Sequence, residues 1–210
     1  MRLKNVKGAK EIIKNGKYYI DNPKEYIGKW NSIFSNNNPI YIEIGMGKGD
    51  FIINSALKNP NINYIGIEKF DSVFVRAVQK SNNLELNNLK LIKIDALELK
   101  EIFNNEIDLI YLNFSDPWPK ERHAKRRLTS PIFLNIYDNL FKKNKYIIMK
   151  TDNADLFNYS LDTLKDNGYK ILYQTNDLYS TNTTNNIRTE YEKKFIAKGI
   201  KINKLEAVKK

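Results

Sequence analysis

A short segment of the sequence, residues 113–127, combines an acid, two prolines and a run of cations. Asp116 comes shortly after an apolar run at 109–112 and directly precedes Pro117-Trp118-Pro119. Proline fixes φ and cannot continue a central strand, so we expect Asp116 to be held rigidly where a strand ends. Five Lys or Arg residues lie between positions 117 and 127. A fixed carboxylate beside clustered cations predicts an active-site loop that meets nucleic acid.

A glycine-rich turn lies nearer the N-terminus. Gly45, Gly47 and Gly49 stand at alternate positions after an apolar run, and Glu43 precedes the first of them by two residues. Glycine lets a backbone turn sharply and come close to a ligand. The third glycine arrives one residue too early for the dinucleotide-binding pattern, and a carboxylate suits an amino group better than a pyrophosphate. The turn predicts a ligand with a cationic end, although a plain strand–helix connection would also explain it.

Two further acids end the next two predicted strands. Glu68 lies 23 residues after Gly45 and is placed to accept hydrogen bonds from both hydroxyls of a ribose, while Asp95 could accept one from an adenine amino group. Either acid alone could be an ordinary surface residue. Ligands of open α/β sheets bind at the carboxyl ends of the strands, where all these acids should meet. An amino acid, a ribose and an adenine without phosphate describe S-adenosylmethionine, which we predict as the cofactor.

A parallel sheet is needed to bring these side chains together. Short runs rich in Ile, Leu and Tyr predict strands covered on both faces at 40–44, 64–67, 89–94, 109–114, 146–150 and 169–173. Helices are predicted between them at 50–57, 71–86, 131–140 and 154–167. This alternation predicts an α/β fold with right-handed crossovers. At 210 residues we expect one domain, 1–210, whose basic segment 1–38 leads into the sheet.

Local signals mark the ends of the last two predicted helices. Thr129-Ser130 precede Pro131, and Asp152-Asn153 precede the helix at 154–167, so both pairs are predicted caps. Gly168 is expected to end that last helix. Asparagine clusters at 36–38 and 182–186 predict exposed loops, the second of them near the site.

Positive charge is concentrated at both ends of the chain and in the proline loop. Segments 1–17, 117–127 and 193–210 hold 18 of the 35 basic residues but only 3 of the 24 acids. Clustered cations are the mark of a polyphosphate partner. Lysine-rich ends could also serve solubility alone, but the loop beside Asp116 favours a nucleic acid.

The composition excludes several classes of site. The chain has no cysteine and its only histidine is His123, which excludes disulfides and a His/Cys zinc site. The N-terminus lacks the apolar core of a signal peptide, and no apolar run approaches the roughly 18 residues of a membrane span. We therefore expect a cytoplasmic protein that needs no metal and no membrane; the sequence predicts no particular oligomeric state.

The glycine turn together with Glu68 resembles class I methyltransferases in general. Three further motifs resemble one family of that class, the bacterial tRNA (guanine-N7)-methyltransferases. The motifs are residues 113–127, Met149-Lys150-Thr151-Asp152-Asn153 and Thr189-Glu190-Tyr191-Glu192-Lys193-Lys194-Phe195. The resemblance implies a Rossmann-like, seven-stranded, mostly parallel sheet with helices on both faces and one antiparallel strand near the C-terminus. It also implies methyl transfer from S-adenosylmethionine to N7 of guanine 46 in the tRNA variable loop, forming 7-methylguanosine.

The same resemblance implies roles for individual residues. Cofactor contacts are implied at Glu43, Glu68, Asp95 and Asp116, beside the three glycines, with Asp116 also the active-site acid. Substrate contacts are implied at Lys120, Asp152, Thr189, Glu190, Tyr191 and Glu192. Contacts with RNA are implied at Arg122, His123, Ala124, Lys125, Arg126 and Arg127.

The chemistry of such a reaction limits what the residues must do. Guanine N7 carries a lone pair and no proton, so its attack on a sulfonium methyl needs no general base. Holding the reactants in line can contribute about 7–11 kcal/mol. A carboxylate at the N1–H and amino edge would orient guanine and favour the cationic product. Asp116, Asp152 and Glu192 are all candidates for this carboxylate, and Asp152 is equally suited to cap a helix.

Two other functions compete with this interpretation. A non-catalytic RNA-binding module could retain the same fold, but the intact glycine turn with Glu43 and Glu68 disfavours it. A nicotinamide-dependent oxidoreductase is disfavoured by the spacing of the glycines.

Overall fold

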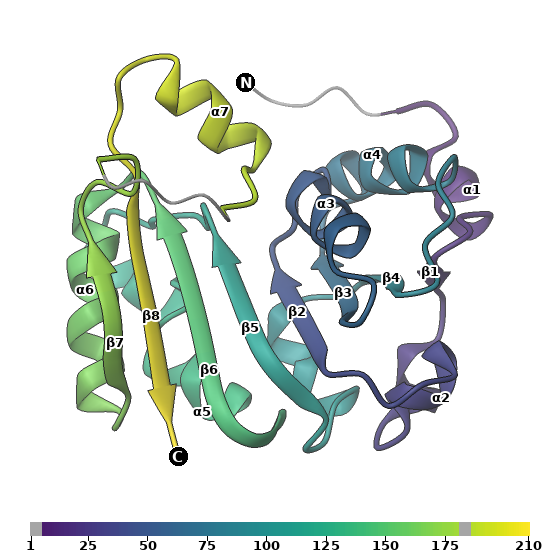
Figure 1. Ribbon diagram of the computed structural model, residues 1–210, viewed down its shortest axis with the longest axis horizontal. Coiled ribbons are helices and arrows are strands. Elements are labelled where there is room, and N and C mark those ends of the chain that lie inside the picture. The colour runs from purple at the N-terminus through teal and green to yellow at the C-terminus, as the bar shows by residue number, and fades with distance from the viewer. Residues whose placement is uncertain (1–5, 181–185) are drawn as a thin grey trace.

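One mixed sheet organises the computed structural model, which describes residues 6–180 and 186–210 (Figure 1). Within these residues the sheet has eight strands in the order β1-β4-β3-β2-β5-β6-β8-β7. The strands are β1 (Tyr19–Ile20), β2 (Ile40–Ile44), β3 (Asn63–Glu68), β4 (Leu89–Lys93), β5 (Ile107–Asn113), β6 (Phe141–Thr151), β7 (Lys170–Thr175) and β8 (Asn203–Lys209).

The pairing of the strands confirms a mostly parallel sheet with an antiparallel strand near the C-terminus. Among the described strands, β8 runs antiparallel to both of its neighbours, β6 and β7, while the other pairs are parallel. The expected number of seven strands is too low by one. The extra strand is the two-residue β1, which pairs with β4 at the edge of the sheet.

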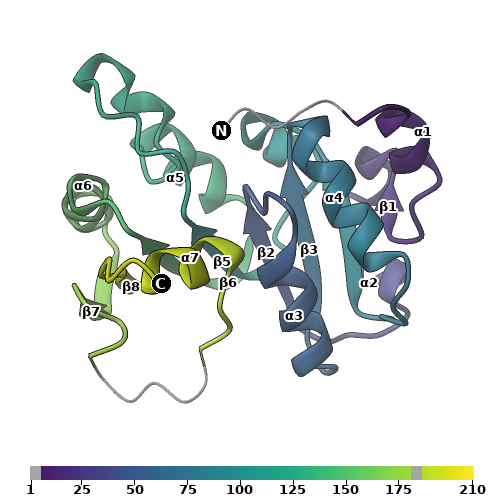
Figure 2. The same ribbon diagram turned by 90° about the horizontal axis from the view of Figure 1, so that it is seen from above.

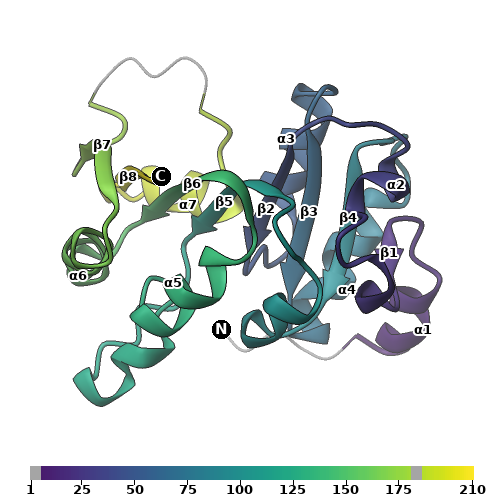
Figure 3. The ribbon, with the colours of Figure 1, turned by 90° about the horizontal axis from the view of Figure 1, so that it is seen from below.

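Helices cover both faces of the sheet. They are α1 (Ala9–Lys14), α2 (Trp30–Phe34), α3 (Asp50–Lys58), α4 (Asp71–Ser81), α5 (Pro131–Asp138), α6 (Ala154–Asp166) and α7 (Glu190–Ile196), with 3₁₀ helices at Pro23–Tyr26, Ala96–Glu101 and Glu121–Arg126. Buried side chains of α1, α3 and α4 form a core on one face, and those of α2, α5 and α6 form a core on the other. Seen from above and from below, α3 and α5 lie on opposite sides of the sheet (Figures 2 and 3).

The strands differ in how far they are covered. All six residues of β3 are buried, as expected of a strand packed on both faces. In β7, by contrast, Leu172 and Tyr173 are 51% and 36% exposed, because α6 covers this edge from one side (Figure 1). The periodicity rule did not find β8, whose buried and half-exposed residues alternate. That alternation is typical of an antiparallel strand with one open face.

Most helix caps follow the sequence. The Asn153 side chain accepts a hydrogen bond from Leu156 N at 2.7 Å and caps α6, and Gly168 ends this helix with φ +83°. Ser130 stands at the N-cap of α5, but its hydroxyl donates to the Lys125 carbonyl at 3.1 Å instead of capping. The helix still begins at Pro131, which has no N–H to satisfy.

Three expectations concern what the chain lacks or leaves outside. None of the described helices is long and apolar enough to cross a membrane. No group of three or more His, Cys, Asp or Glu residues that could hold a metal occurs in the described part of the chain. Of the asparagine loop expected at 182–186, residues 182–185 lie outside the described residues.

Asn153 caps α6, and the neighbouring Asp152 does not, so the two residues should differ in their contribution to stability. We expect Asn153→Ala to lower the free energy of unfolding by about 1 kcal/mol, because Leu156 N loses its acceptor. Asp152→Ala should leave stability within about 0.5 kcal/mol of the wild type, since Asp152 is exposed and is not the cap. Urea unfolding curves measure both values. An equal loss in the two variants would contradict this assignment of the cap.

Candidate active site at the carboxyl ends of the strands

The glycine turn after β2 and the acid at the end of β3 form one hydrogen-bonded unit. Gly47 N donates to Glu68 Oε2 at 3.1 Å. The other carboxylate oxygen of Glu68 accepts from Lys69 N at 2.8 Å and Phe70 N at 3.0 Å. Three backbone donors therefore hold an acid that is only 8% exposed. Glu68 lies where the sequence predicted it, with its orientation fixed by the turn next to it.

The three glycines of the turn serve different purposes. All have positive φ, at 75°, 57° and 77° for Gly45, Gly47 and Gly49. A Cβ on Gly49 would come within 2.8 Å of the Ala77 Cβ, so α3 and α4 could not pack as they do. A Cβ on Gly45 or Gly47 would meet nothing within 4 Å. These two glycines therefore border open space that a ligand can fill, while Gly49 has a packing reason of its own.

Glu43 is buried with only one of its two carboxylate oxygens satisfied. Its side chain is buried, Oε1 accepts from Asn113 Nδ2 at 2.8 Å, and Oε2 has no hydrogen-bond partner among the described residues. Burial raises the pKa of Glu43 to about 8, against the opposing effects of the Asn113 hydrogen bond and the Lys150 charge. An orphaned carboxylate oxygen beside the glycine turn fits a ligand that brings its own N–H donor.

Asp95 also caps a short helix, a role that was not among its predicted ones. Its Oδ1 accepts from Leu97 N at 3.0 Å and caps the 3₁₀ helix Ala96–Glu101, while Oδ2 lies 3.4 Å from Lys69 Nζ. Phe70 and Leu97, each two residues after an acid, are 56% and 51% exposed. Both side chains therefore offer apolar surface close to the strand-end acids, and their exposure could not be read from the sequence.

The proline loop presents Asp116 on a constrained backbone. Phe114 and Trp118, on either side of it, have φ of 51° and 43°, which is unusual for residues other than glycine. Arg127 fastens the loop, since its Nε and a terminal nitrogen each donate at 3.1 Å, to the carbonyls of Pro117 and Trp118. Asp116 is exposed, and its carboxylate makes no hydrogen bond or ion pair with any described residue. The loop is therefore rigid while its acid remains available.

The basic residues of this loop fall into two groups. The Arg127 guanidinium lies 4.3 Å from the centroid of the Tyr159 ring and is committed to holding the loop. The Arg126 guanidinium lies 4.9 Å from the Trp118 ring, which His123 meets edge-on, so Trp118 packs within its own loop. The side chains of Lys120, Arg122 and Lys125 are exposed, whereas His123 and Ala124 are half-buried.

Three aromatic rings lie beside the Asp116 loop. Phe114, Tyr191 and Phe195 have ring centroids 6.0 to 6.3 Å apart in every pair and planes within 25° of one another. Nearly equal distances mean that the three ring centroids form a triangle and not a column. Tyr191 is 56% exposed. Of these three residues, only Tyr191 was assigned a predicted role; Phe195 follows it by four residues, a spacing that places both rings on one side of a helix.

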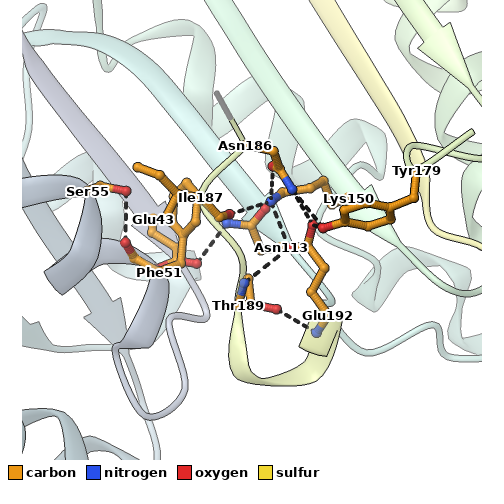
Figure 4. Close-up of polar contacts among 10 residues, drawn as sticks. All are labelled: Glu43, Phe51, Ser55, Asn113, Lys150, Tyr179, Asn186, Ile187, Thr189 and Glu192. Carbon is orange, nitrogen blue, oxygen red and sulfur yellow. Dashed lines mark hydrogen bonds and ion pairs between the residues drawn. The ribbon is translucent and has the colours of Figure 1, made fainter. Parts of the chain in front are cut away.

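Glu192 is buried in a polar network with the end of β6 (Figure 4). Thr189 Oγ1 accepts from Glu192 N at 2.9 Å and Glu192 Oε2 accepts from Thr189 N at 3.1 Å, a capping box at the start of α7. Glu192 also pairs with Lys150 Nζ at 2.9 Å and accepts from Tyr179 and Asn186. The pattern Thr-x-x-Glu before a helix is the sequence signature of a capping box, whereas the family resemblance implied only substrate contacts at these residues.

The three candidate guanine-reading carboxylates thus differ in availability. Asp116 and Asp152 are exposed, whereas Glu192 is fully buried with both oxygens engaged. Burial alone would raise the pKa of Glu192, but the Lys150 charge and the hydrogen bonds hold it below the usual value. The side chain of Glu190 lies outside the described residues.

Comparisons with known proteins point in one direction. A family model described as "Putative methyltransferase" matches residues 37–205. The tRNA (guanine-N(7)-)-methyltransferase of Lachnoclostridium phytofermentans is 50% identical over 209 residues, covering 99% of this chain and 98% of that protein. The protein of the same name from Bacillus subtilis strain 168 is 49% identical over 208 residues, covering 98% of each.

Solved structures agree on the fold. An antibiotic-related methyltransferase superposes with a TM-score of 0.62 at 19% identity, and the 16S rRNA methyltransferase KamB with 0.63 at 11%. Both alignments cover 92% of this chain and 96% of the other. At such identities the likeness shows the fold alone, and it confirms the predicted Rossmann-like class I methyltransferase fold.

The raised pKa of Glu43 predicts a pH dependence of stability. Between the unfolded value of 4.5 and about 8, the unfolded chain ionises this carboxyl while the folded chain keeps it protonated. The wild type should therefore lose up to about 1.4 kcal/mol of stability per pH unit in this window relative to Glu43→Gln, which does not ionise. Unfolding curves at pH 5, 6.5 and 8 measure the difference. A difference independent of pH would show that Glu43 is ionised in the folded protein.

Proposed function

The chain belongs to the tRNA (guanine-N(7)-)-methyltransferase family, and from this premise we propose that it transfers a methyl group from S-adenosylmethionine to N7 of guanine 46 in the variable loop of tRNA. One observation carries the proposal. Glu43 on β2, Glu68 on β3 and Asp116 after β5 stand at the carboxyl ends of neighbouring parallel strands, and Glu43 and Asp116 have acceptor atoms that the described protein does not satisfy.

The donor side of this edge suits S-adenosylmethionine. Glu43 Oε2 would receive the amino group, and Glu68, already aligned by three backbone donors, would accept from the ribose. Phe70 and Leu97 provide exposed apolar surface for the adenine, next to Asp95. When bound, the donor supplies an electrophilic methyl group on a cationic sulfur. The open space beside Gly45 and Gly47 lets the backbone approach it closely.

The acceptor side suits a purine taken out of its stack. The exposed Tyr191 ring, backed by Phe114 and Phe195, would support the base, since stacking on aromatic rings is worth about 1–3 kcal/mol per base. Asp116 would accept from the N1–H and amino edge and stabilise the positive charge that develops on guanine. Asp152 is the second candidate for this role. Glu192 would first have to leave its partners.

The remaining positive charge would bind the tRNA backbone. Lys120, Arg122 and Lys125 project from the loop that carries Asp116, so phosphate contacts there would fix the position of the base relative to the acid. Arg127 instead keeps the loop in shape. With tRNA as its substrate, we place the reaction in the cytoplasm.

A methylation assay tests the proposed function directly. Purified protein incubated with unmodified tRNA transcript and labelled S-adenosylmethionine should form 7-methylguanosine, identified by mass spectrometry of the nucleosides. A transcript with adenine at position 46 should stay unlabelled. Label on another base, or no label on the natural transcript, would reject the proposal. Asp116→Asn should lower kcat by about 100-fold or more, because a charged acceptor facing the developing cation is lost.

Two variants of the Asp116 loop test which of its cations bind tRNA and which hold the loop in shape. Replacing Arg122 and Lys125 by Ala should weaken tRNA binding and flatten its salt dependence by up to about one log–log unit per phosphate contact, with unchanged thermal stability. Arg127→Ala should instead lower the melting temperature, because two loop carbonyls lose their donor. Filter binding at several salt concentrations and thermal denaturation measure these effects. Equal tRNA affinity in the double variant and the wild type would assign Arg122 and Lys125 to solubility.

A further inference from the structure

Lys150, at the end of β6, anchors a segment distant from it in sequence. Its side chain is 3% exposed, and Nζ donates to Glu192 Oε2 at 2.9 Å, to Asn186 Oδ1 at 3.0 Å and to the Ile187 carbonyl at 3.0 Å (Figure 4). An ammonium has three donors, so this one is fully used. All three acceptors belong to residues 186–192. A single side chain therefore holds the approach to α7 and its first turn against the sheet.

The partners of Lys150 are tied to one another. Glu192 accepts from Tyr179 Oη and, at 2.6 Å, from Asn186 Nδ2, while Asn186 Nδ2 lies 2.8 Å from Tyr179 Oη. Lys150, Glu192, Asn186 and Tyr179 therefore form one connected network, in which Tyr179 and Asn186 are half-buried. A buried ion pair is weak evidence for stability, because desolvation offsets most of the Coulomb attraction. What such a network does provide is one defined position for the segments that it joins.

On its other side, Lys150 faces the residues proposed to bind the donor. Asn113 is its partner in the β5–β6 pairing, and Asn113 donates to Glu43 at 2.8 Å. Nζ also lies 5.1 Å from the centroid of the Phe51 ring at the start of α3. Lys150 therefore stands between Glu43 and the segment that carries Tyr191. Because Nζ already uses all three of its N–H groups within the protein, none is left to bind S-adenosylmethionine or the base.

We propose that Lys150 is a positioning residue for methyl transfer, which holds residues 186–192 so that Tyr191 stays packed on Phe114, two residues before Asp116. The inference rests on the proposed function. Transfer to N7 requires base and methyl group in line, and a misplacement of about 1 Å can cost about 100-fold in rate. In the proposed function, the exposed cations of the Asp116 loop would bind the tRNA backbone. Loss of the anchor should therefore affect kcat far more than KM.

The test is Lys150→Met, which keeps the apolar stem and removes the charge and all three donors. We expect kcat to fall about 100-fold while KM for tRNA changes by less than about threefold. Hydrogen–deuterium exchange at residues 186–196 should become faster, and exchange in β2 and β3 should not change. Continued binding of S-adenosylhomocysteine shows that the donor side is still folded.

Lys145→Met is the matched control, the same substitution on the same strand. Lys145 pairs with Asp138 at 2.8 Å and contacts none of the network. We expect it to leave both kcat and the exchange of residues 186–196 at wild-type values.

A double variant keeps the proposal testable if Lys150→Met alone fails to fold. Combining Lys150→Met with Glu192→Gln removes both charges, so no unpaired buried charge remains and much of the stability should return. The kcat should stay below that of Glu192→Gln alone, because Asn186 and Ile187 still lack their donor. A kcat equal to that of Glu192→Gln alone, together with recovered stability, would overturn the proposal and leave Lys150 a purely structural residue.

The failure of this inference differs from that of the proposed function. If the wild-type protein does not methylate tRNA, the proposed function fails, and unchanged exchange at 186–196 in Lys150→Met would then reject the anchor as well. If the wild type methylates tRNA and Lys150→Met retains its kcat, the positioning role alone is overturned.

Discussion

Several carboxylates converge on one edge of the sheet, and the arrangement of the site depends on how each is given a partner. Backbone N–H groups hold Glu68, and Asp95 caps a short helix. Glu192 is neutralised by Lys150. Glu43 is only half satisfied, and Asp116 has no partner in the described part of the chain. Because a buried carboxylate oxygen without a donor is costly, Glu43 has room for a donor from a ligand, whereas the exposed Asp116 is available without such a cost.

The loop that carries Asp116 combines rigidity with an available acid. Prolines and two residues at positive φ restrict its backbone, and Arg127 holds its carbonyls. Since these constraints come from the loop itself, Asp116 is not needed to stabilise it. Cations that are not spent on the loop face solvent and can meet phosphate. In the proposed function, catalysis and tRNA binding would thus use adjacent residues without competing for the same side chain.

Local signals in the sequence determined most of the framework. The predicted strand at 40–44 has the same bounds as β2, Asn153 caps α6, and Gly168 ends that helix. These features could be predicted because periodicity and helix caps depend on residues only a few positions apart. The glycine turn and the strand-end acids were found for the same reason. Strand β8, which lies between β6 and β7, escaped these rules, since its alternating pattern gains meaning only beside these two strands.

Tertiary structure decided which charges are free. Sequence could propose Asp116, Asp152 and Glu192 as equals, but only the fold brings Lys150 to Glu192, 42 positions away, and buries the pair. In the same way Arg127 turns back onto its own loop, and Phe114 meets rings from α7. The sequence alone shows which types of residue could carry out the chemistry. It does not show which of their side chains remain unpaired, because burial and hydrogen-bond partners depend on segments that meet only when the sheet has formed.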